Sequence, residues 1–228
     1  DRVFIDDVLS GPLFDVVSGG EGTSLSEGIP ASEGILTYFV NRIESASGAA
    51  PYSFVSTVPS QMLKPDQMII NEWLAEDLSA HVGDTLQLSY FEVGPLRELT
   101  DTTTTFVVHS ILPIEGRYGD PNLMPDLPGL SDAGNCRDWD TGVPIALESI
   151  RDKDEDYWDE YGGIPKAFIS VSRGEELWKN RFGTFTSFRY SIGGDLAEME
   201  EGLTIASLER SLMEQIEPGM LGFTLEAT

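Results

Sequence analysis

The clearest pattern of apolar and polar positions lies at residues 69–88, IINEWLAEDLSAHVGDTLQL. Ile70, Leu74 and Leu78 recur every four residues, which predicts a helix with one apolar face. The side chains expected to point into water instead are Glu72, Glu76 and Asp77.

A turn and a strand are predicted directly after this helix. Gly83 can adopt the left-handed conformation that ends a helix, and Asp84 suits the turn that follows. Leu86, Leu88 and Tyr90 then alternate with polar residues, as on one face of a strand. The segment therefore predicts a short strand end, a helix, a turn and a new strand in succession.

Similar patterns predict further elements along the chain. Strands are expected at 3–5, 52–58, 103–112, 167–171, 184–192 and 221–225, and residues 35–43 fit either a buried strand or a helix. Helices are expected at 150–161, 174–179 and 203–216. Residues 85–91 and 103–112 are predicted to pair as a long hairpin, whereas 18–33 and 116–144 are expected to be a mobile loop and an irregular excursion. This loose alternation of helices and strands predicts the α+β class.

The most informative feature of the composition is its charge. Asp and Glu number 39 against 14 Lys and Arg, which gives a net charge of −25. Such a polyanion is repelled by phosphate backbones and anionic lipid headgroups, so a nucleic-acid partner and binding to a membrane surface are not expected. The 40% hydrophobic content is enough for a packed core. Cys136 is the only cysteine, so an intrachain disulfide is excluded.

No apolar run approaches the roughly 18 residues that span a bilayer, and no signal peptide is evident. The sequence begins at Asp1 without a methionine. We therefore expect a processed or excised piece, whose missing flanks could hold membrane helices.

Motifs for common enzyme chemistry are absent from the sequence. There is no G-x-S-x-G elbow, no P-loop and no H-E-x-x-H helix. His81 and His109 are the only histidines, and without a nucleophile or second ligand at a useful spacing they favour a structural interpretation. Neither a catalytic residue nor a cofactor is predicted.

Two groups of residues remain as candidates for binding. Asp120, Asp126 and Asp132 lie in the irregular segment and offer the oxygen ligands that calcium prefers, although their spacing does not match an EF-hand loop and a solvated acidic loop is the alternative. Four aromatic residues could line a surface for an apolar passenger or a partner protein, or could instead fill the core: Trp139, Tyr157, Trp158 and Tyr161.

Several segments together resemble one family of membrane proteins. The phrase NEWLAEDL…VGDTLQL resembles the signature of the extracytoplasmic domain of MacB/FtsX-like ABC transporter permeases. Further segments look like those of the long, many-helix members of this family: ILTYFVNRI…PYSFVS, DLPGLSD…CRDWD, IRDKDEDYWDEYGGIPKAFIS and LWKNRFGTFTSFRY. The resemblance then covers most of the chain.

This resemblance implies a domain on the periplasmic face of the bacterial inner membrane, between two membrane helices. It implies a porter-like βαβ subdomain built from both chain ends, at 1–63 plus 165–228, with a mostly β subdomain inserted at 64–164. The expected partners are a separate cytoplasmic ATPase subunit, reached through the membrane helices, and an unknown extracytoplasmic passenger or protein. The full-length protein is expected to be dimeric, and the two ends of the domain to lie close together. The alternative is a secreted acidic hydrolase or carbohydrate-binding protein with carboxylates in a cleft.

Overall fold

The computed structural model describes residues 3–15, 32–94, 98–127, 129–131, 133–139, 144–190, 210, 212–214 and 216. They fall into two compact units. The first unit spans Leu36–Lys179, and the second draws on Arg2–Ile35 and Asn180–Thr228.

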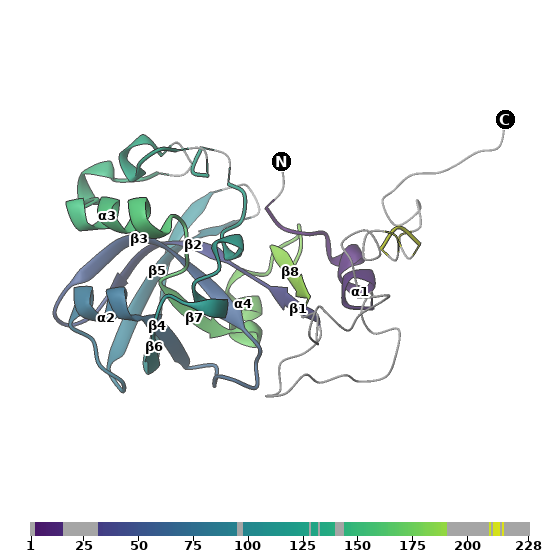
Figure 1. Cartoon of the computed structure of the whole chain (residues 1–228), viewed down its shortest axis with the longest axis horizontal. Helices are drawn as coiled ribbons and strands as arrows, with labels where there is room; N and C mark the ends of the chain where they lie inside the picture. Colours follow the sequence, from purple (N-terminus) through teal and green to yellow (C-terminus); the bar gives the residue numbers. More distant parts are fainter. Residues whose placement is uncertain are drawn as a thin grey trace, which may run out of the picture. The chain divides into compact units, whose positions relative to one another are not determined.

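The first unit is a closed barrel of six strands in the order β2-β3-β7-β4-β6-β5 (Figure 1). The strands are β2 (Tyr38–Glu44), β3 (Ala49–Val58), β4 (Gln67–Asn71), β5 (Thr85–Val93), β6 (Leu99–Leu112) and β7 (Ala167–Ser170). β3 runs parallel to β7, and β4 runs parallel to β6, whereas the other neighbours are antiparallel. The late strand β7 therefore lies between the two early strands β3 and β4.

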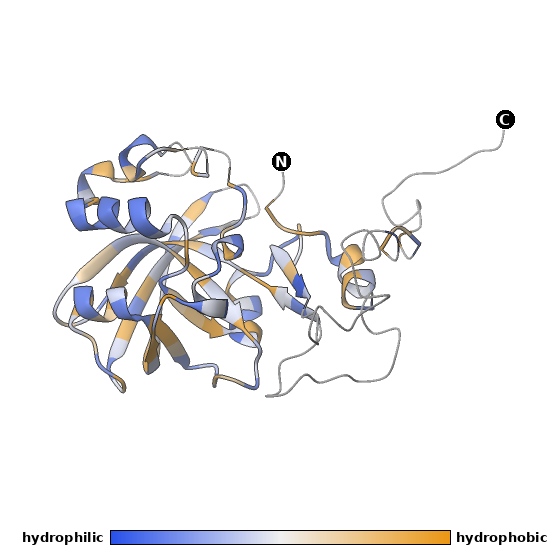
Figure 2. Ribbon diagram, viewed as in Figure 1, coloured by the Kyte–Doolittle hydropathy of each residue, from blue (hydrophilic) through white to orange (hydrophobic). Residues whose placement is uncertain are grey.

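The predicted hairpin forms one side of this barrel. β5 and β6 pair without a break from Thr85 opposite Val107 to Val93 opposite Leu99. Leu86, Leu88 and Tyr90 all point inward and are at most 3% exposed, as their alternation predicts. Figure 2 shows the corresponding apolar bands along the strands.

The predicted helix is α2 (Glu72–Leu78), which packs on β3 and β4. The side chain of Asn71 accepts a hydrogen bond from the Leu74 amide at 2.8 Å, which caps the first turn. The prediction was wrong at both ends of this helix. Ile70 belongs to β4 instead of the helical face, and the helix ends at Ser79, which has a φ of +50°. Gly83, with a φ of +95°, lies in the turn that follows.

Two further helices complete this unit. α3 (Asp152–Tyr161) lies above the barrel in Figure 1, and α4 (Val171–Trp178) follows β7 directly and packs on β3 and β7. Between β6 and α3 the described chain forms only short 3₁₀ turns, at Gly116–Tyr118, Pro121–Leu123, Cys136–Asp138 and Leu147–Ser149. The prediction of an irregular excursion there is confirmed for the described residues.

The second unit contains α1 (Asp7–Asp15) and a two-stranded sheet of β1 (Ser32–Ile35) and β8 (Ser187–Tyr190). The predicted strand at 3–5 is reduced to a single bridge between Ile5 and Phe185. Helix α1 was not predicted. Of the helix predicted at 203–216, the described residues Arg210 and 212–214 are helical, while the strand predicted at 221–225 and most of the loop predicted at 18–33 lie outside the described residues.

The mixture of helices and strands confirms the α+β class. The division into 1–63 plus 165–228 and an insert at 64–164 stays a prediction, and the compact units have other bounds. Strands from both predicted parts share the barrel: β2, β3 and β7 from one, and β4, β5 and β6 from the other.

Candidate functional site

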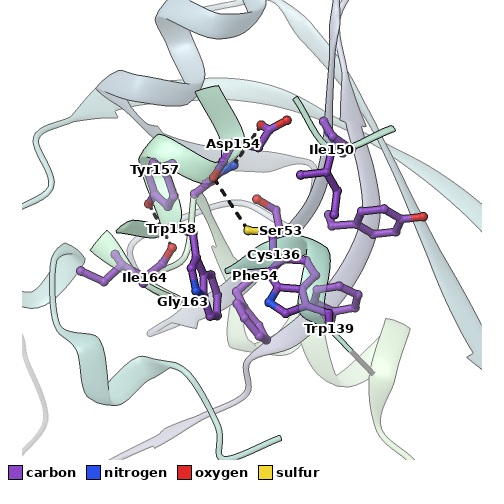
Figure 3. Close-up of a pocket in the computed structure, with 15 residues that line it drawn as sticks. Ser53, Phe54, Cys136, Trp139, Ile150, Asp154, Tyr157, Trp158, Gly163 and Ile164 are labelled. Atoms are coloured by element: carbon purple, nitrogen blue, oxygen red, sulfur yellow. Dashed lines mark hydrogen bonds and ion pairs between the residues drawn. The ribbon is translucent and has the colours of Figure 1, made fainter. Parts of the chain in front are cut away.

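A small cavity in the first unit gathers most of the notable side chains (Figure 3). Its volume is about 20 Å³, which is space for about one water molecule. It is bounded by β3, the turn at Cys136–Asp138, helix α3 and the chain that leads into β7. Its walls are mainly aromatic, and they include Phe39, Tyr52, Phe54, Trp139, Tyr157 and Trp158.

Lys166 is the buried cation of this site, with only 4% of its surface exposed. Its backbone ties two strands together, because its amide donates to the Phe54 carbonyl and its carbonyl accepts from the Asn71 amide, both at 3.0 Å. The ammonium lies 4.1 Å from the ring centroid of Trp73 and 4.5 Å from that of Tyr157. Such cation–π contacts stabilise a desolvated ammonium.

Burial lowers the pKa of Lys166 to about 8, although the Asp154 carboxylate acts in the opposite direction. The Lys166 ammonium and an Asp154 oxygen are 3.7 Å apart. Rings and carboxylate together therefore compensate only part of the cost of burying this charge.

Arg151 links helix α2 to the start of helix α3. Its guanidinium donates to Asp77 at 2.7 and 3.2 Å, to Asp154 at 2.6 and 2.7 Å, and to the Ala49 carbonyl at 2.9 Å. Lys153 also pairs with Asp77. The prediction that Asp77 stays in water was wrong, because its side chain is 2% exposed. The ion pairs neutralise a carboxylate that the helical pattern alone had assigned to the wet face.

Tyr157 holds α2 and the approach to β7 together. Its hydroxyl accepts a hydrogen bond from the Asn71 side chain and donates one to the Ile164 carbonyl, both at 3.0 Å. Burial raises the pKa of this hydroxyl, so it stays protonated at neutral pH. Asn71 thus uses its oxygen to cap α2 and its nitrogen to contact α3.

Cys136 packs in an apolar cluster with Phe54, Leu130, Trp139 and Ile150. Its backbone amide donates to Glu155 at 3.0 Å. Burial and, to a smaller extent, the nearby charge of Glu155 raise the pKa of the thiol to about 12. A thiol that stays protonated is a poor nucleophile, so Cys136 acts here as a packing residue.

Two polar atoms that line the cavity have no hydrogen-bond partner among the described residues. They are Oγ of Ser53 and Nε1 of Trp139. Ser53 is 4% exposed and Trp139 is 9% exposed, so bulk water does not replace the missing partners.

An open groove of about 520 Å³ adjoins the cavity across the barrel surface. Pro51 and Tyr52 line both hollows, so these two residues are shared by the cavity and the groove. Tyr52 has a φ of +37°, an unfavourable conformation for a bulky residue. Its hydroxyl accepts a hydrogen bond from the Ala146 amide at 2.6 Å, and its ring stacks on Phe39 at 5.8 Å between centroids.

Two of the three calcium candidates, Asp120 and Asp126, lie in the described part of the chain. Asp120 caps the turn at Pro121–Leu123 by accepting from the Asn122 amide at 2.9 Å. Asp126 is exposed, and Asp132 lies outside the described residues. No three His, Cys, Asp or Glu side chains among the residues searched lie close enough to hold a metal ion.

The four aromatic candidates form two contacting pairs. Trp139 and Trp158 contact edge to face at 5.0 Å between centroids, and Tyr157 and Tyr161 lie 5.0 Å apart. Trp139 and Tyr157 are buried, whereas Trp158 and Tyr161 are partly exposed. A role for this group in contacting a partner stays a prediction.

Sequence reasoning missed Ser53 and Lys166. A signal for Lys166 exists, because it interrupts the apolar run IPKAFI. A lysine inside such a run is either at an edge or buried with partners. Nothing comparable marks Ser53, which lies within an ordinary strand sequence.

Neither a scan against models of protein families nor a search of curated proteins finds a match to this chain. Within the described residues, no helix has the length and apolar character needed to cross a membrane.

Proposed function

We propose that this chain is a non-catalytic extracytoplasmic domain of a MacB/FtsX-like ABC transporter permease. ATP would be hydrolysed by a separate cytoplasmic subunit, and the membrane helices of a dimeric full-length protein would pass the motion to this domain. The domain would then act on a passenger or partner at the periplasmic face of the inner membrane. The porter-like subdomain at 1–63 plus 165–228 is part of the same proposal.

One observation supports this proposal best. The segments that carry the resemblance are far apart in the sequence, yet they pack against one another around Lys166. Asn71 and Trp73 come from the NEWLAEDL phrase, whereas Tyr157 and Lys166 come from the DEDYWDEYGGIPKAFIS segment. Segments that resemble one family and also form one packed cluster are expected if the whole unit is shared with that family.

The ion pairs favour a mechanical role over carboxylate chemistry. Arg151 joins Asp77 on α2 to Asp154 on α3, so these two helices are cross-linked over the barrel. Because both buried carboxylates are occupied by cations, they support a rigid unit better than they support an acid–base pair.

The location can be tested with a cysteine placed on the surface of α2. In the full-length gene product, Cys136→Ala removes the thiol of this domain, any cysteine outside the domain is replaced by Ala, and Glu76→Cys adds a thiol at an exposed position. A membrane-impermeant maleimide applied to spheroplasts should label this cysteine without lysis. Leu74→Cys, which is buried two residues away, serves as the matched control and should stay unlabelled while the protein is folded.

Labelling of Glu76→Cys only after lysis would place the domain in the cytoplasm and reject the proposal. The second arm is purification of the full-length protein from membranes with a mild detergent. An ATP-hydrolysing subunit should accompany it, and a soluble full-length product without such a subunit would also contradict the proposal.

A further inference from the structure

The polar groups around the cavity divide into those that are paired and those that are not. The Tyr157 hydroxyl both donates and accepts a hydrogen bond. The Asp154 carboxylate accepts from Arg151. Only Ser53 Oγ and Trp139 Nε1 remain unpartnered among the described residues that line the cavity. Buried polar atoms without a partner are rare in folded proteins and call for a physical explanation.

The groups that remain favour one kind of partner. An indole nitrogen only donates, and a serine hydroxyl can donate. The nearby Lys166 ammonium also has donors and no acceptor. What is missing from the cavity is therefore a hydrogen-bond acceptor.

The surroundings restrict the rest of such a partner. Phe39, Phe54 and Trp158 give the cavity an apolar wall, and Figure 3 shows Trp139 and Trp158 on either side of Phe54. The charged groups nearby are already engaged in ion pairs, Lys166 with Asp154 and Arg151 with both Asp154 and Asp77. A neutral partner leaves these pairs intact and avoids the cost of desolvating a further charge.

The sizes of the cavity and of the groove determine which part of the partner each can hold. The cavity accommodates about one water, whereas the adjoining groove of about 520 Å³ lies in the range of small-molecule sites. Tyr52 lines both hollows, and its hydroxyl accepts a hydrogen bond from the Ala146 amide. Its backbone φ of +37° is unfavourable, and residues with such backbone strain cluster at active sites and ligand sites.

We propose that the cavity and the groove form one binding site for a small, neutral molecule with a flat apolar body and a carbonyl oxygen. The carbonyl oxygen accepts hydrogen bonds from Trp139 Nε1 and Ser53 Oγ. The apolar body lies in the groove beside Tyr52, whose ring turns aside to connect the two hollows. This site does not depend on where the domain is located in the cell.

Acetophenone is a suitable probe, and ethylbenzene is its matched control, because the two have similar shapes but only the first has a carbonyl. The 228-residue chain contains four tryptophans, so its indole N–H groups give four signals in an NMR spectrum. Trp139→Phe identifies the signal of interest and keeps an aromatic ring in the cluster. We expect acetophenone to shift the Trp139 signal in a saturable way and ethylbenzene to leave it in place.

Two variants connect this shift to the proposed contacts. Ser53→Ala should weaken acetophenone binding by about 2- to 10-fold, which corresponds to the loss of one hydrogen bond. Tyr52→Phe removes the tie to Ala146 but keeps the ring, and it should strengthen binding. Ser47→Ala, at an exposed position outside both hollows, should change nothing.

If acetophenone did not shift the Trp139 signal, the proposal would be overturned. This would hold even if slow hydrogen exchange of the Trp139 indole N–H indicated a trapped water beside it. Equal shifts with ethylbenzene would also overturn it, because the carbonyl would then have no role. Binding to Ser53→Ala with unchanged affinity would remove the serine contact and with it the geometry proposed here.

Discussion

The β5–β6 hairpin and the segment between β6 and α3 belong to the same unit but are held in different ways. The hairpin is fixed by a continuous backbone ladder and by buried apolar side chains, Leu86, Leu88 and Tyr90 in β5 and Phe106 and Val108 in β6. The described part of the segment forms short 3₁₀ turns and is fixed by a few apolar anchors, Leu130, Cys136, Trp139 and Ile150, in a cluster with Phe54. A regular element thus spreads its stabilisation over many residues, whereas the irregular segment depends on a few.

The largest effect is expected in the hairpin. Phe106 is 1% exposed in β6, and Phe106→Ala should lower the free energy of unfolding by about 3–5 kcal/mol, because it leaves a cavity in the barrel. Thr105→Val, on the exposed face of the same strand, should stay within about 0.5 kcal/mol. Urea unfolding of both variants provides the measurement, and equal losses would contradict the assignment of the two faces.

A smaller loss is expected when an anchor of the irregular segment is removed. Leu130 is fully buried, and Leu130→Ala should cost about 2–3 kcal/mol, at the lower end for such changes, because short turns can close in on the space. Hydrogen exchange should show increased opening around residues 129–139 and little change in β5. If the hairpin opened equally, the segment and the barrel would form a single cooperative element and the contrast between them would fail.

Lys166 provides a pH-dependent test of the contact between the barrel and α3. Its pKa is lowered from 10.5 to about 8 by burial, so above about pH 8 the unfolded state binds more protons than the folded state. Stability should therefore rise between about pH 8 and pH 9, on the order of 1 kcal/mol. The rise should end near pH 9, because burial raises the pKa of the Cys136 thiol from 9.0 to about 12, and the unfolded state then binds fewer protons at this group than the folded state.

Urea unfolding across this pH range should show the rise in the native protein and in Lys64→Met, whose lysine is exposed. Lys166→Met should lack it. If the stability of Lys166→Met also rose over this pH range, a group other than Lys166 would be responsible for the difference in proton binding.

The smallest effect concerns the acidic part of the irregular segment. Asp120 is engaged as a turn cap and Asp126 is exposed, so we expect calcium to raise the melting temperature no more than sodium chloride of equal ionic strength. Both salts should raise it, since they screen a net charge of −25. A rise specific to calcium that Asp120→Asn abolished would instead reveal a defined site.

The sequence predicted those elements whose signal is local. The alternation at Leu86, Leu88 and Tyr90 identified β5, and the run of β-branched residues identified β6. Closure of the barrel was not predictable in this way, because the pairing of β3 with β7 joins residues more than a hundred positions apart. Helix α1 was missed since Gly11 and Pro12 within it normally indicate a turn.

The candidate site shows the same limit. Asp77 was assigned to water from its helical position, and only its contact with Arg151, 74 residues away, explains its burial. Trp139 and Tyr157 were singled out as aromatic candidates and both are buried, but the hydrogen-bonding state of the Trp139 indole depends on neighbours that the sequence does not identify.

The position of β7 has a consequence for how this chain is made. β3 and β4 lie within residues 49–71, but the strand that separates them is synthesised about a hundred residues later, at Ala167–Ser170. Until then each of these two strands has an open edge, and the nascent chain must not let them pair with each other. Because such distant pairing delays folding, the barrel can close only after β7 has been translated. A chain that stops before Ala167 therefore exposes two apolar strand edges, and we expect it to aggregate instead of forming a smaller barrel.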